Sequence, residues 1–245
     1  MTRREYHEEL PSTQQRALVL ARAGAPAGTV VVAGRQSAGL GRSDHIWWSP
    51  PGGLYLSMVV PFPPRRAALL PLALGARLSE AFAVRFRIEI RVKWPNDLIV
   101  LDSRGTPRKL GGVLVDAVPS PTLGTAAVIG VGLNVAPIGD APSQVRARPV
   151  ALSELVSEPP SLYEVEGLTV SEVGRVAEAI QDPVEAEELL TLCRARLYGV
   201  GRRASVDGRP VGTIEGLGEE GELWCMSTEG PVAVRAGDLT VEESP

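Results

Sequence analysis

The sequence predicts an α/β protein in which a large domain of helices and strands precedes a small β-barrel. Residues 1–197 alternate between segments of helical spacing and short β-branched or apolar runs bounded by turn residues. Residues 198–245 hold short strands separated by three turn pairs, Asp207-Gly208, Glu220-Gly221 and Glu229-Gly230. Asp-Gly is a strong hairpin signal, and the other two pairs are compatible with tight turns. We therefore expect a domain boundary near residue 198.

Four elements are expected in the first third of the chain. They are a helix over residues 12–22, strands over 28–33 and 54–60, and a helix over 67–84. Ser12 or Thr13 can cap the first helix, and Pro71 suits the first turn of the second. The intervening residues 36–53 have no period of 2 or 3.6, and long loops of this kind in compact domains are often functional.

Six further elements are expected before the barrel. They are strands over residues 88–93, 97–101, 110–118 and 126–135, and helices over 171–180 and 184–197. The strands 97–101 and 110–118 are joined by a turn-rich segment and should form a hairpin. Residues 141–190 carry no motif from which a function can be inferred.

Composition excludes several classes of function. The chain has 245 residues and a formal net charge of −4, so no basic field attracts it to nucleic acid or to an anionic membrane. Its charged N-terminus does not resemble a signal peptide, and the apolar run 67–84 contains Arg77 and Glu80, as in a buried amphipathic helix. Two distant cysteines, Cys193 and Cys225, favour a reducing compartment. We expect a cytoplasmic protein that does not span a membrane.

Histidine is too scarce to dominate the chemistry. His7 and His45 are the only two in the sequence, which nearly excludes a histidine-rich metal site and limits any catalytic triad. If the protein is an enzyme, lysine, arginine, carboxylates and backbone groups must supply its chemistry.

The loop 36–53 has the composition of an anion-binding segment. Gly39 and Gly41 let backbone N–H groups approach a ligand, and Arg42 can grip a phosphate with two hydrogen bonds. Trp47 and Trp48 offer flat faces for a ring. The same composition also suits a mobile surface loop with packed tryptophans.

Three further motifs follow at intervals. They are Lys93-Trp94-Pro95-Asn96-Asp97, Lys109-Leu110-Gly111-Gly112 and Gly130-Val131-Gly132-Leu133-Asn134. Asn96 and Asp97 suit adenine, magnesium or a turn backbone equally well. Lys109 begins an apolar strand next to two glycines that leave room for a ligand. Gly130 and Gly132 suggest close backbone approach, although a β-bulge is the more common explanation of that motif taken alone.

In this order the four motifs resemble the biotin–protein ligase family. The similarity runs from about Ser12 to Val135, and Lys93 to Asp97 is its most specific segment. The resemblance implies a mixed β-sheet catalytic domain with flanking helices that binds biotin and ATP on one face. It also implies that the C-terminal barrel is SH3-like.

The resemblance also implies site residues. The biotin pocket would be lined by Ser12, Thr13, Gln36, Gly39, Lys109, Gly112 and Gly130. The ATP site would hold Arg42, Trp47, Asn96, Asp97, Leu133 and Asn134. Arg42 and Lys109 would be the catalytic cations at the phosphate and carboxylate, and Asp97 would lie near magnesium.

The chain departs from the family pattern in three places. Gln14 stands where the family often has asparagine, Leu40 replaces an arginine of the glycine-rich loop, and His45-Ile46 replaces a basic residue before Trp47. The loop is therefore less cationic than usual. Only 11 residues precede Ser12, so we expect no helix-turn-helix and no DNA-binding role.

The function implied by the resemblance is ATP-dependent biotin ligation. Biotin would be activated to biotinyl-5′-AMP with Mg²⁺ and ATP, and then transferred to a lysine of a biotin carboxyl carrier protein domain. A lipoate or octanoate ligase, a catalytically weak biotin-binding regulator and a structural interaction protein remain alternatives. Whether the chain forms a homodimer is left open.

Overall fold

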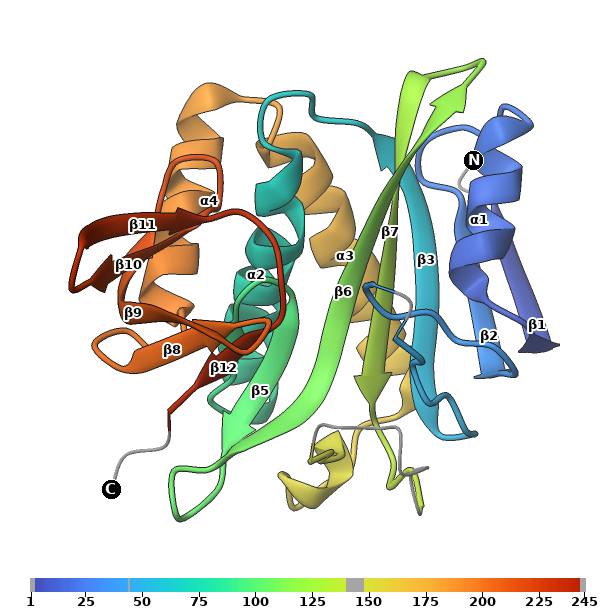
Figure 1. Ribbon diagram of the computed structural model, residues 1–245. Coiled ribbons are helices and arrows are strands. Elements are labelled where there is room, and N and C mark those ends of the chain that lie inside the picture. Colours follow the sequence, from blue (N-terminus) through green and yellow to red (C-terminus); the bar gives the residue numbers. More distant parts are fainter. Residues whose placement is uncertain (1–2, 44, 140–147, 243–245) are drawn as a thin grey trace.

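A computed structural model describes residues 3–43, 45–139 and 148–242. It contains a seven-stranded sheet in the order β1-β2-β3-β7-β6-β5-β4 and a five-stranded sheet in the order β11-β10-β9-β8-β12 (Figure 1). The first sheet is mixed, because β1 and β2 are parallel while all other neighbouring strands in this sheet are antiparallel. The mixed α/β architecture expected from the sequence is confirmed.

The bounds of the elements are as follows. The larger sheet contains β1 (Arg4–Leu10), β2 (Val30–Gln36), β3 (Gly53–Pro61), β4 (Arg91–Lys93), β5 (Asp97–Leu101), β6 (Pro107–Ser120) and β7 (Gly124–Asn134). The helices are α1 (Thr13–Arg22), α2 (Leu70–Phe86), α3 (Leu162–Ala179) and α4 (Pro183–Arg196), with 3-10 turns at Ala67–Leu69 and Leu152–Glu154. The C-terminal sheet contains β8 (Arg203–Val206), β9 (Arg209–Leu217), β10 (Leu223–Ser227), β11 (Gly230–Val234) and β12 (Leu239–Val241).

Helices cover the two faces of the larger sheet unequally. On one face α2 and α3 pack against alternate strand residues such as Leu56, Ile129 and Val131 in one large apolar core. On the other face α1 covers only a small cluster that includes Val59 and Val128. The remainder of that second face is therefore left uncovered by helices, and the candidate site lies there.

Two expected elements needed correction, and one strand was not expected at all. The N-terminal segment forms the edge strand β1, which the sequence does not announce because charged residues occupy both of its faces. Within 88–93 only Arg91–Lys93 pairs as a strand, since β4 is a short edge strand. The helix expected over 171–180 begins earlier, at Leu162, where Ser161 accepts a hydrogen bond from the Glu164 N–H as a cap.

Helix α2, together with the 3-10 turn before it, is long and apolar enough to cross a membrane, but the structure gives it another role. Its residues Leu70, Leu74 and Leu78 are fully buried between the sheet and helices α3 and α4. It is the central helix of the core, as expected from Arg77 and Glu80, which form an ion pair on its surface.

The C-terminal sheet joins the same core. The first two expected turn pairs lie between strands, the third overlaps the start of β11 at Gly230, and Asp207 and Gly208 adopt the positive φ of a tight hairpin. Its buried residues Ile214 and Leu223 belong to the cluster that contains α2. The indole N–H of Trp94 also donates a 3.0 Å hydrogen bond to the Gly221 carbonyl, so the C-terminal sheet is held against the end of β4.

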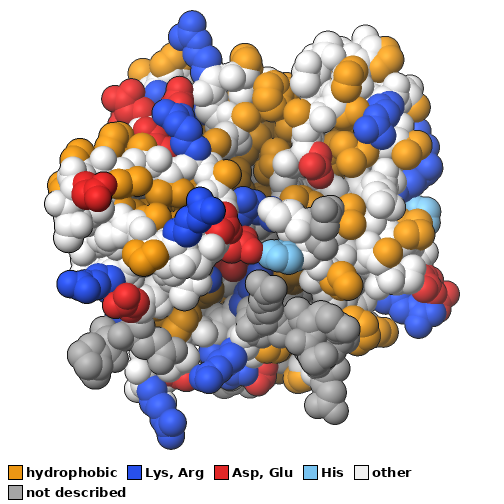
Figure 2. Space-filling view, viewed as in Figure 1, with side chains coloured by type: hydrophobic (Ala, Val, Ile, Leu, Met, Phe, Trp, Pro, Cys, Tyr) orange, Lys and Arg blue, Asp and Glu red, His pale blue; other side chains and the backbone are white. Residues whose placement is uncertain are grey.

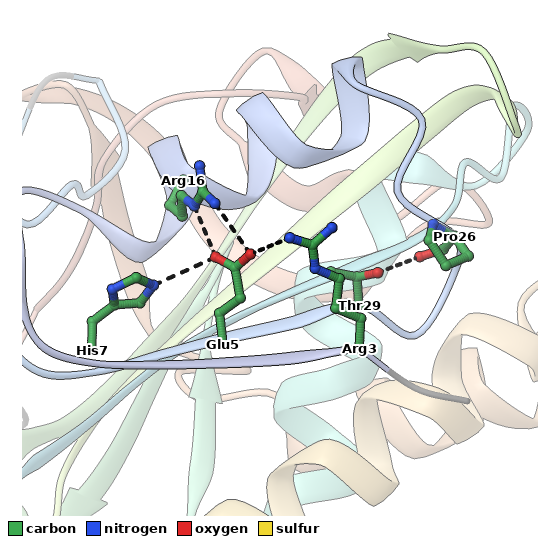
Figure 3. Close-up of polar contacts among 6 residues, drawn as sticks. All are labelled: Arg3, Glu5, His7, Arg16, Pro26 and Thr29. Carbon is green, nitrogen blue, oxygen red and sulfur yellow. Dashed lines mark hydrogen bonds and ion pairs between the residues drawn. The ribbon is translucent and has the colours of Figure 1, made fainter.

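Edge strand β1 is held to α1 by charge. The Glu5 carboxylate accepts hydrogen bonds of 2.8 and 3.1 Å from the Arg16 guanidinium and lies beside Arg3 and His7 (Figure 3). The contact with Arg16 lowers the pKa of Glu5 from 4.5 to about 2, although burial opposes the shift. This cluster helps to orient the helix whose N-terminus borders the site.

Candidate active site

A cavity of about 710 Å³ lies on the uncovered face of the larger sheet, between α1, the loop 36–53 and the C-terminal sheet. Figure 2 shows a hollow in this region, with acidic and basic side chains gathered at its mouth. Most of the expected site residues line it: Ser12, Thr13, Gln36, Arg42, Trp47, Asn96, Asp97, Lys109, Gly112, Gly130 and Asn134. We call this cavity the cleft.

Gly39 and Leu133 lie outside the lining of the cleft. A Cβ at Gly39 would lie 2.4 Å from the Trp47 carbonyl oxygen, so this glycine lets the loop fold tightly on itself. The Leu133 side chain belongs to the core on the opposite face of the sheet. Their predicted ligand contacts remain predictions.

The end of the cleft beside α1 is polar and uncharged. The Gln36 amide oxygen accepts a 2.8 Å hydrogen bond from the Thr13 backbone N–H, and its Nε2 donates one of 2.8 Å to Ser49 Oγ. Thr13 Oγ1 lies 2.9 Å from Ser57 Oγ on β3. These groups are largely buried, so their hydrogen bonds hold the polar atoms in fixed positions.

Gln14 extends this polar network from α1 to β6 and β7. Its Nε2 donates to Asp116 Oδ2 at 2.8 Å and to the Val128 carbonyl at 2.9 Å, while its Oε1 accepts from Ser57 Oγ at 3.0 Å. A Cβ at Gly130 would lie only 2.5 Å from that Oε1. Gly130 therefore makes room for a side chain of the protein itself, a requirement that the sequence does not reveal.

The middle of the cleft is charged. Lys109 Nζ on β6 lies 2.6 Å from Asp97 Oδ1 on β5, in an ion pair whose side chains are only 24% and 21% exposed. The same ammonium lies 5.2 Å from the centre of the Trp47 ring, within the range of a cation–π contact. Lys109 is thus a confined cation with one carboxylate partner.

Trp47 reaches the cleft floor because Gly132 has no side chain. A Cβ at Gly132 would lie 2.5 Å from the indole nitrogen of Trp47. That Nε1 is buried and has no hydrogen-bond partner among the described residues. A buried donor without an acceptor is costly, so the position of this indole lowers the stability of the protein as it stands.

The two asparagines of the site mainly organise the chain. The Asn96 side chain donates to the Val113 carbonyl at 2.9 Å, which positions the turn between β4 and β5. Asn134 donates to the carbonyls of Lys109 and Val150 at 3.2 and 3.3 Å. Asn134 therefore fixes the backbone from which Lys109 projects.

The C-terminal sheet forms one wall of the cleft. Asp238, Leu239 and Thr240 line it, and the loop 36–53 reaches across to this wall. An Arg42 N–H donates to the Gly237 carbonyl at 3.5 Å, and His45 Nε2 lies 3.6 Å from Asp238 Oδ2. These contacts place the C-terminal sheet at the site.

Lys93 lines the cleft as well, although the sequence assigned it no role. Burial lowers the pKa of its ammonium, and the charge of Lys109 adds to that shift while Asp97 and Asp238 oppose it. Gln14, Ser57 and Asp238 were also missed, because their contacts join residues far apart in the chain.

A metal ion held by protein ligands alone has no site among residues 3–43, 45–139 and 148–242, where no group of three or more His, Cys, Asp or Glu side chains converges. Mg²⁺ is commonly held by one or two carboxylates together with substrate phosphates. Asp97 fits that more limited role.

A polar pocket that leads to confined cations beside a buried indole suits an enzyme that binds a small molecule next to a nucleotide. The sequence profile of the biotin/lipoate A/B protein ligase family matches residues 6–134. Because the match covers more than half of the chain, the protein belongs to this family.

Individual relatives agree with this assignment. The bifunctional ligase/repressor BirA of Bacillus subtilis is 27% identical over 240 residues, which span 96% of this chain and 72% of the relative. BirA of Escherichia coli is 38% identical over 112 residues, or 44% of this chain and 33% of the relative. The structure of the biotin protein ligase from Aquifex aeolicus in complex with biotin and ATP has a TM-score of 0.82 at 25% identity, with 100% of both chains covered.

Proposed function

We propose that this protein is a biotin–protein ligase that activates biotin with ATP and attaches it to a lysine of an acceptor protein. One observation carries the proposal: the Lys109–Asp97 pair lies beside Trp47 in a cleft whose end beside α1 is a fixed polar network. Similarity over the full length to a biotin protein ligase in complex with biotin and ATP supports it.

In the first step, the biotin carboxylate attacks the α-phosphorus of ATP. A bond forms between the carboxylate oxygen and phosphorus, the bond to the β-phosphate oxygen breaks, and pyrophosphate leaves. Two anions must approach each other, and catalysis of such reactions depends mainly on positioning and charge stabilisation. Lys109 neutralises both the carboxylate and the α-phosphate, with Arg42 as a second cation from the loop.

The Lys109–Asp97 ion pair must be broken for this step to occur. In the structure, the ammonium is already matched by a carboxylate at 2.6 Å. ATP would therefore compete with Asp97 for Lys109, and Asp97 would be the residue to hold a Mg²⁺ that accompanies the nucleotide. That ion would neutralise phosphate charge.

In the second step, the amine of an acceptor lysine attacks the biotinyl carbonyl carbon, and AMP leaves. The mixed anhydride must be kept from water until the acceptor arrives. The loop 36–53, held against the C-terminal sheet through Arg42 and His45, covers the cleft for this purpose. The acceptor is expected to be a biotin carboxyl carrier protein domain, in the cytoplasm.

The test is mass spectrometry of a biotin carboxyl carrier domain after incubation with this protein, biotin, ATP and magnesium. The proposal expects one added biotin on the carrier lysine, and no addition when ATP is omitted. Parallel reactions contain lipoate or octanoate in place of biotin. Modification by either acid alone would assign the protein to the lipoate branch of its family.

Measurable biotin binding without any transfer would instead support a regulatory protein. Calorimetry of biotin with the same preparation distinguishes that result from a misfolded sample.

A further inference from the structure

We propose that Lys93 is the cation that receives the departing pyrophosphate in the adenylation step. The inference rests on the proposed function and adds a residue to it. Two observations and one chemical argument support it: the order of the strands beneath the cleft, the absence of an ion-pair partner for Lys93 among the described residues, and the direction in which pyrophosphate must leave.

The strand order arranges the cleft in a line. The polar end contacts β2 and β3 through Gln36 and Ser57, Lys109 projects from β6, and Lys93 ends β4 at the far edge of the sheet. The intervening strands are β7 and β5. Because neighbouring strands lie roughly 5 Å apart, Lys109 lies about midway between the polar end and Lys93.

The chemistry of adenylation then assigns a part of the substrates to each part of the cleft. Biotin occupies the polar end with its carboxylate toward Lys109, so the α-phosphorus is attacked near the middle of the cleft. In phosphoryl-type transfer the attacking and leaving oxygens are roughly in line on opposite sides of phosphorus. The pyrophosphate must therefore leave on the side away from biotin, toward β4 and Lys93.

Lys93 has the charge that this position requires. It is opposite Asp97 in the β4–β5 register, yet Asp97 forms its ion pair with Lys109. The other nearby carboxylate, Asp238, lies beside His45. Among the described residues no carboxylate forms an ion pair with Lys93, although its side chain is partly buried in the cleft wall.

An unpaired, partly desolvated ammonium is destabilising unless an anion reaches it. The lowered pKa of Lys93, caused chiefly by burial, agrees with that environment. Pyrophosphate carries the charge to satisfy the ammonium and gains charge as the bond to the α-phosphorus breaks. Lys93 thus stabilises the leaving group, while Lys109 acts on the attacking carboxylate and the α-phosphate.

The experiment separates the two steps. Lys93→Met removes the charge but keeps an unbranched side chain, and Lys93→Arg keeps the charge. Arg91→Met, on the same strand but outside the cleft lining, is the matched control. The first step is measured as biotinyl-AMP formation in a single turnover, and the second as transfer to the carrier domain from supplied biotinyl-AMP.

We expect Lys93→Met to slow the first step by about 10²–10³, the usual loss when a preorganised charge is removed. The second step and the affinity for biotin should be unchanged, because pyrophosphate takes part in neither. Inhibition by added pyrophosphate should weaken, and Lys93→Arg should recover most of the first-step rate. Arg91→Met should behave as wild type.

An equal loss in both steps, or an unaffected first step, would overturn the role of Lys93. The same holds if pyrophosphate inhibits Lys93→Met as strongly as it inhibits wild type. These results require an active wild type, so they are distinct from failure of the proposed function, in which wild type itself forms no biotinyl-AMP.

Discussion

The two ends of the cleft are built in opposite ways. Beside α1, polar side chains such as Gln36, Thr13 and Gln14 have partners within the protein and carry no charge. Beside β4 to β6, the ion pair of Lys109 with Asp97 lies next to Lys93, which forms no ion pair within the part of the chain that the structure describes. The first end is organised before a ligand binds, whereas the second must exchange partners when a nucleotide enters.

This difference indicates that the polar end recognises the substrate and that the charged end promotes the reaction. A fixed hydrogen-bond network favours one arrangement of donors and acceptors, which is suited to selecting a substrate. A cation with few partners within the protein has few interactions to lose when it turns toward a reacting anion. Substitutions at the two ends should therefore affect different quantities, with affinity for biotin at one end and the rate of adenylation at the other.

The largest expected effect is at the charged end. Lys109→Ala should lower the rate of biotinyl-AMP formation by about 10²–10³, because a central preorganised charge is lost. Single-turnover adenylation measures this loss, with thermal unfolding as the check on folding. Arg104→Ala, in the turn between β5 and β6, is the control and should retain activity. Near-normal adenylation by a folded Lys109→Ala protein would remove Lys109 from the mechanism.

At the polar end, Gly130→Ala should weaken biotin binding by roughly tenfold, the equivalent of one disturbed buried hydrogen bond. Its Cβ would displace the Gln14 oxygen that lies 2.5 Å away. Calorimetry gives the affinity, and adenylation at saturating biotin should change less. Gly174→Ala, in α3 with open space around it, is the control and should bind biotin normally. Unchanged affinity in Gly130→Ala would show that the network does not set recognition.

The loop that covers the cleft should show a smaller effect. Arg42→Gly removes its contact with the Gly237 carbonyl and a cation that faces the phosphate. Release of free biotinyl-AMP should rise by roughly fivefold, because a partly exposed charged hydrogen bond contributes about 1 kcal/mol. Chromatography of the released intermediate in the absence of acceptor measures it. No increase would mean that Arg42 does not retain the intermediate.

The smallest effect lies outside the cleft, at Glu5. Its pKa is lowered to about 2, so its ion pair with Arg16 stabilises the protein above pH 4.5 and this contribution is lost as pH falls toward 2. Glu5→Gln should reduce the free energy of unfolding by about 1 kcal/mol at neutral pH. Urea unfolding should show the difference from wild type shrinking below pH 4.5, and a difference independent of pH would contradict this assignment.

The sequence predicted most of the cleft because its motifs are local. Lys109, Asp97 and Trp47 lie in short segments whose residue types already indicated anion and ring binding, and the structure brings them together. The C-terminal strands were predictable for the same reason, since each turn is encoded by two adjacent residues. The ligand contacts of Lys109, Asp97 and Trp47 remain predictions.

What the sequence could not show depends on distant pairs. Gln14 meets Asp116 across 102 positions, and Trp94 meets Gly221 across 127. No local spacing encodes such contacts, so the polar network and the position of the C-terminal sheet emerged only from the fold. Strand β1 was missed because an edge strand with charges on both faces lacks the alternation by which strands are recognised.

The most direct test of the central claim is biotin-dependent exchange of labelled pyrophosphate into ATP, compared between wild type and Lys109→Ala. Wild type should catalyse exchange only when biotin is present and not with lipoate or octanoate, and the variant should lose about 10²–10³ of the exchange rate. Exchange that needs no biotin, or that lipoate supports equally well, would contradict the claim that this cleft joins biotin to ATP.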